Sequence, residues 1–494
     1  MSLDPTHTPV LVGLGQSIER DDVITTVELA ARAAEAAFDD APGLRERLQR
    51  LTFVSVIFSP ASAAIASEAC ERLGLGEVAR ETTSPGGNTP QWLMNRACEQ
   101  VVNGELETTL ILGAETTRSM KLADPDRDFM RAALESREKD GPKDEVVGAS
   151  MRGMLHQAEI EAQLVRPADT YPVFESALAA KLGSDLEGSR ERIAGWMSRS
   201  SEVAAKNPFA WFQQVRSAEE IATANPANRI TAEPYTKCMN SFANVDQGAA
   251  LMVTTLAIAR ELGLADQAIF PWAGANSADL APSEREDLGD SPALRAAAEA
   301  TFAAAGVGLD DIDYIDLYSC FPIAVEVSAN AIGLAFDDPR GLTQTGGMSF
   351  FGGPGNNYTT HGIAATALRL REGGRLGYAT GNGGVLSKHS IGIYSNQAPS
   401  QPFRVADTTA AQAAIKASAL DVVLEAEGEA VVAGGTVVYG RDGAPASAPI
   451  IATLADGRRV VATPKPEILA SLAGRSLVGE TVRVSGGHPV EYAL

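Results

Sequence analysis

Four cysteines are the strongest candidate nucleophiles in this chain, because a thiolate attacks carbonyl carbon readily. They are Cys70, Cys98, Cys238 and Cys320. Their spacing matches no metal-binding pattern, and scattered free cysteines are typical of a reducing compartment. Cys70 and Cys98 lie within helical patterns and are expected in the core. Cys320 follows a predicted strand, so it is either a reactive thiol or a buried, inert one.

A second candidate for chemistry is the loop Ser84-Pro85-Gly86-Gly87, which precedes the helical pattern Gln91-Trp92-Leu93-Met94. A serine hydroxyl attacks a carbonyl only when a base is paired with it. Serine followed by proline is also a favourable start for a helix. We therefore expect Ser84 to cap the helix, and we keep a nucleophilic role as the alternative.

The elements that would position these groups occur in two similar halves. An Ala-rich hexapeptide at 33–38 returns at 297–302, and each copy lies on a helical stretch that runs into a strand, at 51–56 and 314–318. Two further strand pairs match, 10–13 with 269–274 and 109–115 with 376–381. The repetition predicts a duplicated α/β core of βαβ-type halves with largely parallel sheets. The active site is expected where the halves meet.

Composition limits the classes of function. The 494 residues are 45% hydrophobic and 21% charged, which is typical of a soluble protein with more than one domain. We find no run of about twenty apolar residues and no signal peptide, so we expect a cytoplasmic protein without membrane contact. The net charge of −22 argues against nucleic acid and anionic membranes as partners. A phosphorylated ligand would need a local basic patch.

The chain divides into four predicted segments. Residues 1–120 with 231–265 form the first α/β half, and residues 266–395 form the second. Residues 121–230 form an inserted helical loop domain, in which arginines are interleaved with aromatic residues. This insertion is either a lid or binding subdomain, or a helical excursion with its own small core.

The last segment, residues 403–494, follows a linker and changes character. Its Val-rich stretches alternate as strands do, and Asp442-Gly443 and Asp456-Gly457 are typical hairpin turns. The pattern predicts an additional small β-barrel domain, with an OB-like barrel as one form.

The order of several motifs resembles the thiolase superfamily over about residues 8–395. The motifs are Leu112-Gly113-Ala114-Glu115, Cys238-Met239-Asn240 before Asp246-Gln247-Gly248-Ala249-Ala250, and Leu317-Tyr318-Ser319-Cys320-Phe321. The last resembles the His-Asp-Cys-Phe element of the sterol-carrier type. The resemblance implies the thiolase fold, layered α/β/α/β/α, and an acyltransferase like acetyl-CoA acetyltransferase. It also implies coenzyme A or acyl-CoA as a ligand, no permanently bound cofactor, no metal, and a homodimer.

Thiolase chemistry uses a nucleophilic cysteine, a histidine that activates it, a proton-shuttling second cysteine and groups that stabilise the oxyanion. By the resemblance, Ser84 stands at the first cysteine, Thr380 at the second, and Tyr318 at the oxyanion-side His or Asn. Cys320 matches the pocket cysteine of the sterol-carrier type. The standard catalytic set is therefore mostly replaced.

The family's Gly-His-Pro motif has two registers here. The ungapped register places Gly353 at the histidine, and the other takes His361 and needs an insertion. The separation from Thr380 favours the ungapped register, so the catalytic histidine is predicted to be absent. Gly486-Gly487-His488-Pro489 spells the motif literally, but it lies in the C-terminal β segment and is set aside.

These residues lead to three hypotheses. The first is a thiolase-fold protein that binds coenzyme A or acyl-CoA but is not a competent thiolase. The second is an active acyltransferase that uses Cys320 or Ser84 with His361. The third is an interaction or scaffold protein in lipid metabolism, with a protein partner at 403–494.

The predicted coenzyme contacts come from the inserted loop domain. They are Arg152, His156, Arg199 and Trp211. Because the additional domain could block the usual dimer contact, a monomer is kept as the alternative to the homodimer.

Overall fold

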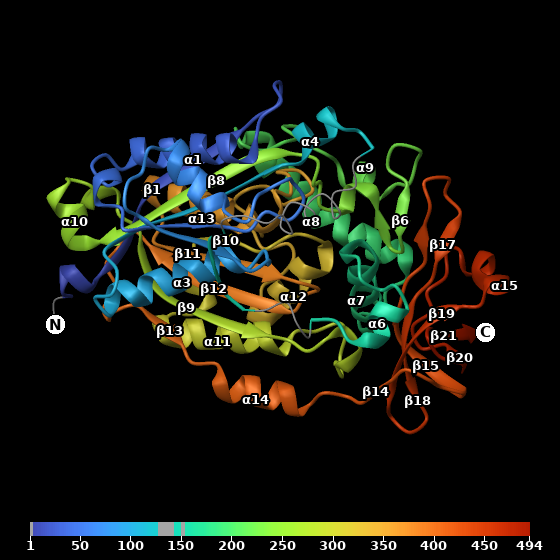
Figure 1. The fold of residues 1–494 in the computed structure, drawn as a ribbon. Helices are drawn as coiled ribbons and strands as arrows, with labels where there is room; N and C mark the ends of the chain where they lie inside the picture. Colours follow the sequence, from blue (N-terminus) through green and yellow to red (C-terminus); the bar gives the residue numbers. More distant parts are fainter. Residues whose placement is uncertain (1–2, 127–142, 150–153) are drawn as a thin grey trace.

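Two mixed β-sheets face each other across a layer of buried helices (Figure 1). The computed structural model describes residues 3–126, 143–149 and 154–494. The N-terminal sheet has the order β1-β8-β4-β2-β3-β5. Its strands are β1 (Pro9–Ile18), β2 (Arg50–Phe53), β3 (Ala79–Thr83), β4 (Thr108–Thr116), β5 (Glu145–Val147) and β8 (Asp246–Thr255).

The C-terminal sheet has the order β10-β11-β12-β9-β13. Its strands are β9 (Phe270–Ala278), β10 (Tyr314–Asp316), β11 (Leu376–Gly383), β12 (Lys388–Ser395) and β13 (Arg404–Ala406). The strand β13 follows the linker at 396–402, so the chain returns to this sheet before it enters the C-terminal barrel. The helix α14 (Thr409–Ala417) then packs on α11 (Pro292–Ala305).

Helices form the other three layers. Between the sheets lie α3 (Thr89–Val102) and α13 (Tyr358–Glu372), and both contact both sheets. Residues 358–367 of α13 are all buried, as expected for a helix covered on every side. The outer layers contain α1 (Thr26–Asp40), α2 (Ile65–Arg72) and α10 (Leu256–Glu261) on one side, and α11 with α12 (Pro322–Ile332) on the other. This α/β/α/β/α arrangement confirms the predicted thiolase-type fold.

The internal repeat is also confirmed. Helices α1 and α11 carry the two Ala-rich copies, and each packs on the first strand of its own half, β1 and β9. The expectation of largely parallel sheets is wrong, because β8 and β12 run antiparallel to both of their neighbours. For β12 the reason is local: four residues connect it to β11, and so short a connection can join only antiparallel strands.

The inserted segment is mainly helical. Its described helices are α4 (Thr117–Ala123), α6 (Gln157–Glu161), α7 (Pro167–Lys181), α8 (Leu186–Lys206) and α9 (Ala218–Ala222), and its strand β5 belongs to the N-terminal sheet. The strands β6 (Ile230–Ala232) and β7 (Tyr235–Thr236) follow. A buried ion cluster fixes α7 and α8 to α12. Arg192 Nη2 lies 2.6 Å from Glu175 Oε1 and 3.1 Å from Glu326 Oε2, and both carboxylates are fully buried.

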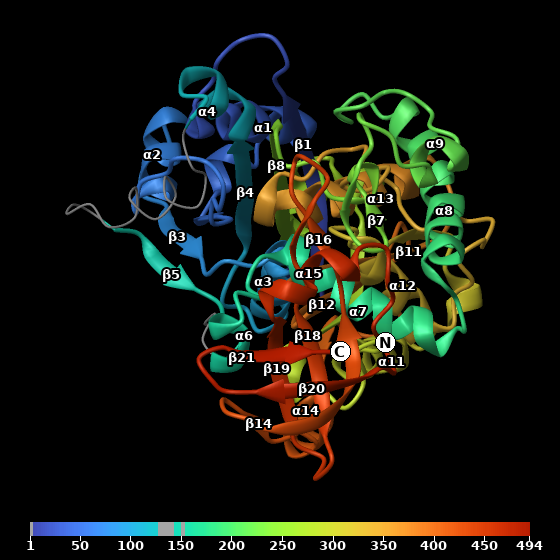
Figure 2. The same ribbon diagram turned by 90° about the vertical axis from the view of Figure 1, so that its right-hand side faces the viewer.

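The C-terminal segment contains a closed five-stranded barrel, which confirms the predicted small OB-like domain (Figure 2). Its strands are β15 (Gly428–Gly435), β18 (Ile450–Leu454), β19 (Arg459–Pro464), β20 (Thr481–Ser485) and β21 (Val490–Ala493), with α15 (Pro466–Leu469) between β19 and β20. Parallel pairing of β19 with β21 closes the barrel, and β14 (Val422–Val423) extends it beside β19.

The barrel is docked on the inserted domain. The strand β16 (Val438–Tyr439) pairs with β17 (Pro445–Ser447) on one side and with β6 on the other. Glu233 receives hydrogen bonds from Arg190 Nη1 at 3.0 Å and from the Tyr439 hydroxyl at 2.9 Å. Barrel residues Ile451 and Val461 join the main hydrophobic core. No helix among the described residues is long and apolar enough to cross a membrane.

Candidate functional site

Ser84 directly follows β3 and does not begin a helix. Its N–H donates to the carbonyl of Val147 in β5 at 2.7 Å, so Ser84 continues the strand pairing. Helix α3 begins at Thr89 with Asn88 as its N-terminal cap residue, so the predicted cap at Ser84 is wrong. The Ser84 side chain is buried, and its Oγ has no hydrogen-bond partner among the described residues.

The glycines after Ser84 let other loops approach closely. The N–H of Gly86, at φ +154°, donates to Asn356 Oδ1 at 3.0 Å. A Cβ atom on Gly87 would overlap the hydroxyl and ring of Tyr318, closer than real Cβ contacts allow. Tyr318 therefore fills the space over Gly87, in the loop that the resemblance assigns to the nucleophile.

Tyr318, in the loop after β10, is brought together with Thr380 of β11. The Tyr318 N–H donates to Thr380 Oγ1 at 2.9 Å. The Tyr318 ring meets the ring of Tyr358 edge to face, with centroids 5.6 Å apart. Burial raises the pKa of Tyr318 well above its ordinary value, so its hydroxyl is neutral at physiological pH. Thr380 thus positions the backbone of Tyr318.

Gly353 faces the side chain of Ser241. Its N–H donates to the carbonyl of Phe242 at 2.9 Å, and a Cβ atom at this position would overlap Ser241 Oγ. The backbone φ of Gly353 is open to other residues, since no left-handed angle occurs there. A side chain at position 353 would therefore require the Ser241 hydroxyl to move, and the backbone itself would not be strained.

Cys320 forms a polar cluster with Tyr171 of α7 and Asn382 of β11. Asn382 Nδ2 lies 2.9 Å from Tyr171 Oη and 3.8 Å from Cys320 Sγ. The N–H of Leu386 also donates to Tyr171 Oη, at 3.1 Å. Burial raises the pKa of the Cys320 thiol to about 12. The sulfur is therefore a neutral thiol at physiological pH, which is a poor nucleophile.

Three buried polar atoms around these loops have no hydrogen-bond partner among the described residues. They are Ser84 Oγ, Asn88 Oδ1 and Asn382 Oδ1. The loop before α3 touches the end of β11, since a Cβ atom on Gly383 would meet Asn88 Oδ1 and one on Gly87 would meet the carbonyl of Asn382. Buried polar atoms are nearly always paired, so such a concentration indicates a place where a ligand or water completes the bonding.

His361 lies on α13 and is fully buried. Its Nδ1 is 2.8 Å from Gln16 Oε1, and its ring packs against Phe351 with centroids 5.0 Å apart. Burial lowers the pKa of His361 to about 3, so the ring is neutral. Among the described residues, its hydrogen-bond partner is Gln16, and neither Ser84 nor Cys320 is bonded to it.

The predicted coenzyme contacts that the structure describes lie at different places in the protein. Arg152 lies outside the described residues. His156 caps α6, and its Nδ1 accepts the N–H of Ala158 at 3.2 Å. The N–H of Trp211 donates to the carbonyl of Phe351 at 2.7 Å. Arg199 lines a groove of about 710 Å³ between α8 and the C-terminal half.

Two further features concern metals and the literal Gly-His-Pro motif. Among the described residues, no group of three or more His, Cys, Asp or Glu side chains could hold a metal ion. His488 lies between β20 and β21 of the barrel, and its Nδ1 is 3.1 Å from Glu161 Oε2. The motif is therefore outside the α/β core, as predicted.

Comparison with solved structures decides the family. A monomeric SCP2-thiolase-like protein type 1 from Mycobacterium smegmatis matches with 31% sequence identity and a TM-score of 0.85, and the match covers 100% of both chains. The chain belongs to the type 1 thiolase-like proteins. A family profile for the additional C-terminal domain of thiolase-like protein type 1 also matches residues 411–487.

Two more distant structures share the fold of this thiolase-like protein. An Ltp2-ChsH2(DUF35) aldolase matches at 17% identity and a TM-score of 0.60, over 80% of this chain and 99% of that one. An acetyl-CoA acetyltransferase from Syntrophomonas wolfei matches at 16% identity and a TM-score of 0.58, over 79% and 99%.

Sequence reasoning missed three residues of this thiolase-like site. Asn382 lies two residues after Thr380 but was given no role. Tyr171 lies in a helix with no recognisable motif, and Ser241 faces Gly353 only through the fold. An Asn between glycines was a usable signal, because glycine-rich loops bring side chains close to backbone. For Tyr171 and Ser241 the sequence contains no such signal.

Proposed function

We propose that this type 1 thiolase-like protein binds coenzyme A or an acyl-CoA and does not catalyse thiolysis or Claisen condensation. The observation that carries the proposal is the set of unpartnered atoms Ser84 Oγ, Asn88 Oδ1 and Asn382 Oδ1 at the junction of the loops. The two amide oxygens are hydrogen-bond acceptors, and the pantetheine arm of coenzyme A offers amide N–H groups to them.

The side chains around these atoms support the proposal that the protein does not catalyse the thiolase reaction. Thiolysis needs a thiolate, a base to form it and a group to move the α-proton. Here Cys320 is a neutral thiol with a pKa of about 12, and His361 is a buried, neutral ring that bonds Gln16. Thr380 holds the N–H of Tyr318. None of these groups is arranged as a nucleophile with its base.

A second candidate keeps acyl transfer, with Cys320 or Ser84 as nucleophile and His361 as base. The specific feature in its favour is the unpartnered Ser84 Oγ, which is free to bond a substrate. His361 would have to exchange its bond to Gln16 for one to the nucleophile. Mutation of Cys320 or Ser84 to Ala would then abolish turnover, whereas the binding proposal expects no turnover to lose.

A third candidate is a scaffold role for the barrel in lipid metabolism. The barrel packs on its own inserted domain through the β16–β6 pairing, and this favours a role inside the chain over an external partner. We also propose a cytoplasmic location, which the four free cysteines support.

Calorimetric titration with coenzyme A and acetyl-CoA tests the binding, and thiolysis of acetoacetyl-CoA is assayed on the same sample. We expect saturable heat without turnover. Asn382→Ala should weaken acetyl-CoA binding, because it removes an amide from the site, while Gln397→Ala in the exposed linker should not. If titration of the wild-type protein with either ligand releases or absorbs no heat, the proposal that it binds coenzyme A or acyl-CoA is refuted. If the protein turns over acetoacetyl-CoA, the proposal that it does not catalyse thiolysis is refuted.

A further inference from the structure

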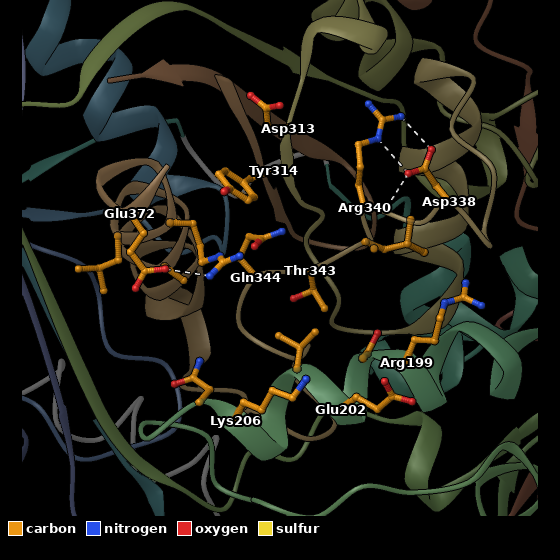
Figure 3. A pocket seen from close by; sticks show the side chains of 18 of the residues that line it. Arg199, Glu202, Lys206, Asp313, Tyr314, Asp338, Arg340, Thr343, Gln344 and Glu372 are labelled. Carbon is orange, nitrogen blue, oxygen red and sulfur yellow. Dashed lines mark hydrogen bonds and ion pairs between the residues drawn. The ribbon is translucent and has the colours of Figure 1, made fainter. Parts of the chain in front are cut away.

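A groove of about 710 Å³ lies between α8 and the C-terminal half, outside the loops around Cys320 (Figure 3). One wall is α8, and the other is formed by residues 338–344 and the end of α13. This volume is within the usual range of small-molecule sites. Its lining contains aromatic rings, side-chain amides and eight charged side chains. Which ligands the groove can bind depends on which of these charges are already paired within the protein.

Most charges on the wall opposite α8 are already paired. Arg340 Nη2 lies 2.8 Å from Asp338 Oδ2, and Arg340 also donates to two backbone carbonyls. Arg369 lies 2.8 Å from Glu372 and stacks over the Tyr314 ring. Asp313 accepts two backbone N–H groups, at 2.6 and 3.0 Å. Both arginines of this wall are therefore neutralised by carboxylates, and Asp313 adds a negative charge, so a phosphate group is expected on the opposite wall, α8.

The charges on α8 differ. Lys206 and Glu202 form no ion pair or side-chain hydrogen bond with any described residue, and Arg199 donates to the carbonyl of Phe336. The three are exposed and lie on one face of the helix, with Arg199 and Lys206 about 10 Å apart along its axis. Arg199 has five N–H donors and uses one of them on Phe336, so the others remain for a ligand. Arg199 and Lys206 against Glu202 give this face of α8 one net positive charge, in a protein of net charge −22.

We propose that the groove binds a nucleotide-sized molecule that carries phosphate, with Arg199 and Lys206 as its phosphate contacts. Guanidinium and ammonium groups are the usual phosphate-binding side chains. The rings of Phe209 and Tyr314 and the amides of Gln16 and Gln344 line the remaining space for a base and sugar. No acid–base chemistry is required of the groove.

Two kinds of ligand carry a phosphorylated nucleotide of this size: a free nucleotide, and coenzyme A through its nucleotide end. Trp196 and Ser200 line both the groove and a second, small cavity that is also lined by Ser319 and Gly347. The groove therefore adjoins the loops of the candidate site. The inference does not depend on the proposed function, since a free nucleotide satisfies it equally.

Calorimetry with adenosine 3′,5′-bisphosphate, coenzyme A and acetyl-pantetheine tests the groove in the full chain. We expect the bisphosphate to bind, and Arg199→Gln and Lys206→Gln each to weaken it by about tenfold or more. Glu202→Gln should tighten it, because a like charge is removed. Lys416→Gln on α14 is the matched control and should change nothing. All four substitutions are at exposed positions, and circular dichroism checks their folding.

The outcomes separate the two sources. Parallel loss of coenzyme A binding in R199Q and K206Q, with acetyl-pantetheine binding unchanged, assigns the groove to the nucleotide end of coenzyme A. Unchanged coenzyme A binding in these variants assigns it to a free nucleotide. The inference is overturned if the wild-type protein does not bind the bisphosphate, or if R199Q and K206Q bind it as the wild type does. Failure of the proposed function would instead appear as no binding of acetyl-pantetheine or coenzyme A while the bisphosphate still binds.

Discussion

Ser241 occupies the space that a side chain at Gly353 would need. A Cβ atom on Gly353 would overlap Ser241 Oγ, although the backbone at 353 would accept other residues. Gly353 is the position that the resemblance assigns to the histidine of the thiolases. A side chain at position 353 and the hydroxyl of Ser241 therefore compete for the same space, so the two positions are coupled.

The first prediction is that Gly353→His neither creates thiolase activity nor leaves the fold unaffected. The new side chain must displace Ser241, and overpacking of a buried position costs roughly 1–3 kcal/mol. We expect a lower midpoint of thermal unfolding and no thiolysis of acetoacetyl-CoA.

The control is the double variant Gly353→His/Ser241→Gly, which removes the overlapping hydroxyl. It should recover part of the stability lost in the single variant, because neighbouring substitutions are not additive. Equal unfolding midpoints for Gly353→His and the wild type would show that the two residues do not compete for space.

The second prediction concerns the reactivity of Cys320. Cys320 is partly buried, and desolvation raises the pKa of its thiol to about 12 although hydrogen bonds from Tyr171 and Asn382 lower it, so almost no thiolate exists at pH 8. Iodoacetamide should therefore label Cys320 very slowly in the folded protein, and all four cysteines should react in urea. Peptide mass spectrometry gives the rates. Rapid labelling of Cys320 at pH 7 would mean a lowered pKa and would favour the acyltransferase alternative.

The third prediction is a pH dependence that comes from Glu115. This carboxylate accepts the N–H of Ile57 and the hydroxyl of Ser59, both at 2.6 Å, yet burial raises its pKa to about 7. An acid whose pKa is higher in the folded state favours folding at low pH. Its contribution is complete below about pH 4.5 and is lost as the pH rises to 7, by roughly 3 kcal/mol.

Comparison with Glu115→Gln isolates this effect, because other buried acids titrate in both proteins. The stability advantage of the wild type over the variant should shrink between pH 4.5 and pH 8, as measured by urea unfolding. A constant difference across this range would mean that Glu115 has an ordinary pKa.

The fourth prediction is that the protein is a monomer. The edge strand of the N-terminal sheet on this side is β5, which has only three residues and pairs with β3 through residues 145–147. So short an edge offers few backbone groups to a second chain. Unpaired strand edges are the usual site of edge-to-edge association. Light scattering after size exclusion should give about the chain mass, 51.7 kDa, at all concentrations tested. A mass of twice this value would show that β5 does not prevent dimer formation.

The sequence predicted the core elements well, because their signals are local. The Ala-rich copies on α1 and α11 and the strands that follow them depend on periodicity, and the barrel on alternation and hairpin turns. The direction of β8 was not predictable in this way, since its pairing with β1 and β4 joins segments that are far apart in the chain.

The site was less predictable, because it depends on contacts between loops. Cys320 could be predicted as a site residue because it lies in a sequence motif. Its neighbour Tyr171 could not, because it comes from a helix of the inserted domain that carries no motif. The cap at Ser84 was predicted from the dipeptide alone. The helix begins later because the chain first passes Gly86, whose φ of +154° is not helical.

The measurement that tests the central claim most directly is the intact mass of the protein after incubation with acetyl-CoA, on a sample shown by calorimetry to bind it. A thiolase would retain an acetyl group on its nucleophile. We predict binding with an unchanged mass. A protein heavier by one acetyl group, with the modification mapped to Cys320 or Ser84, would contradict the claim that this site binds the thioester without chemistry.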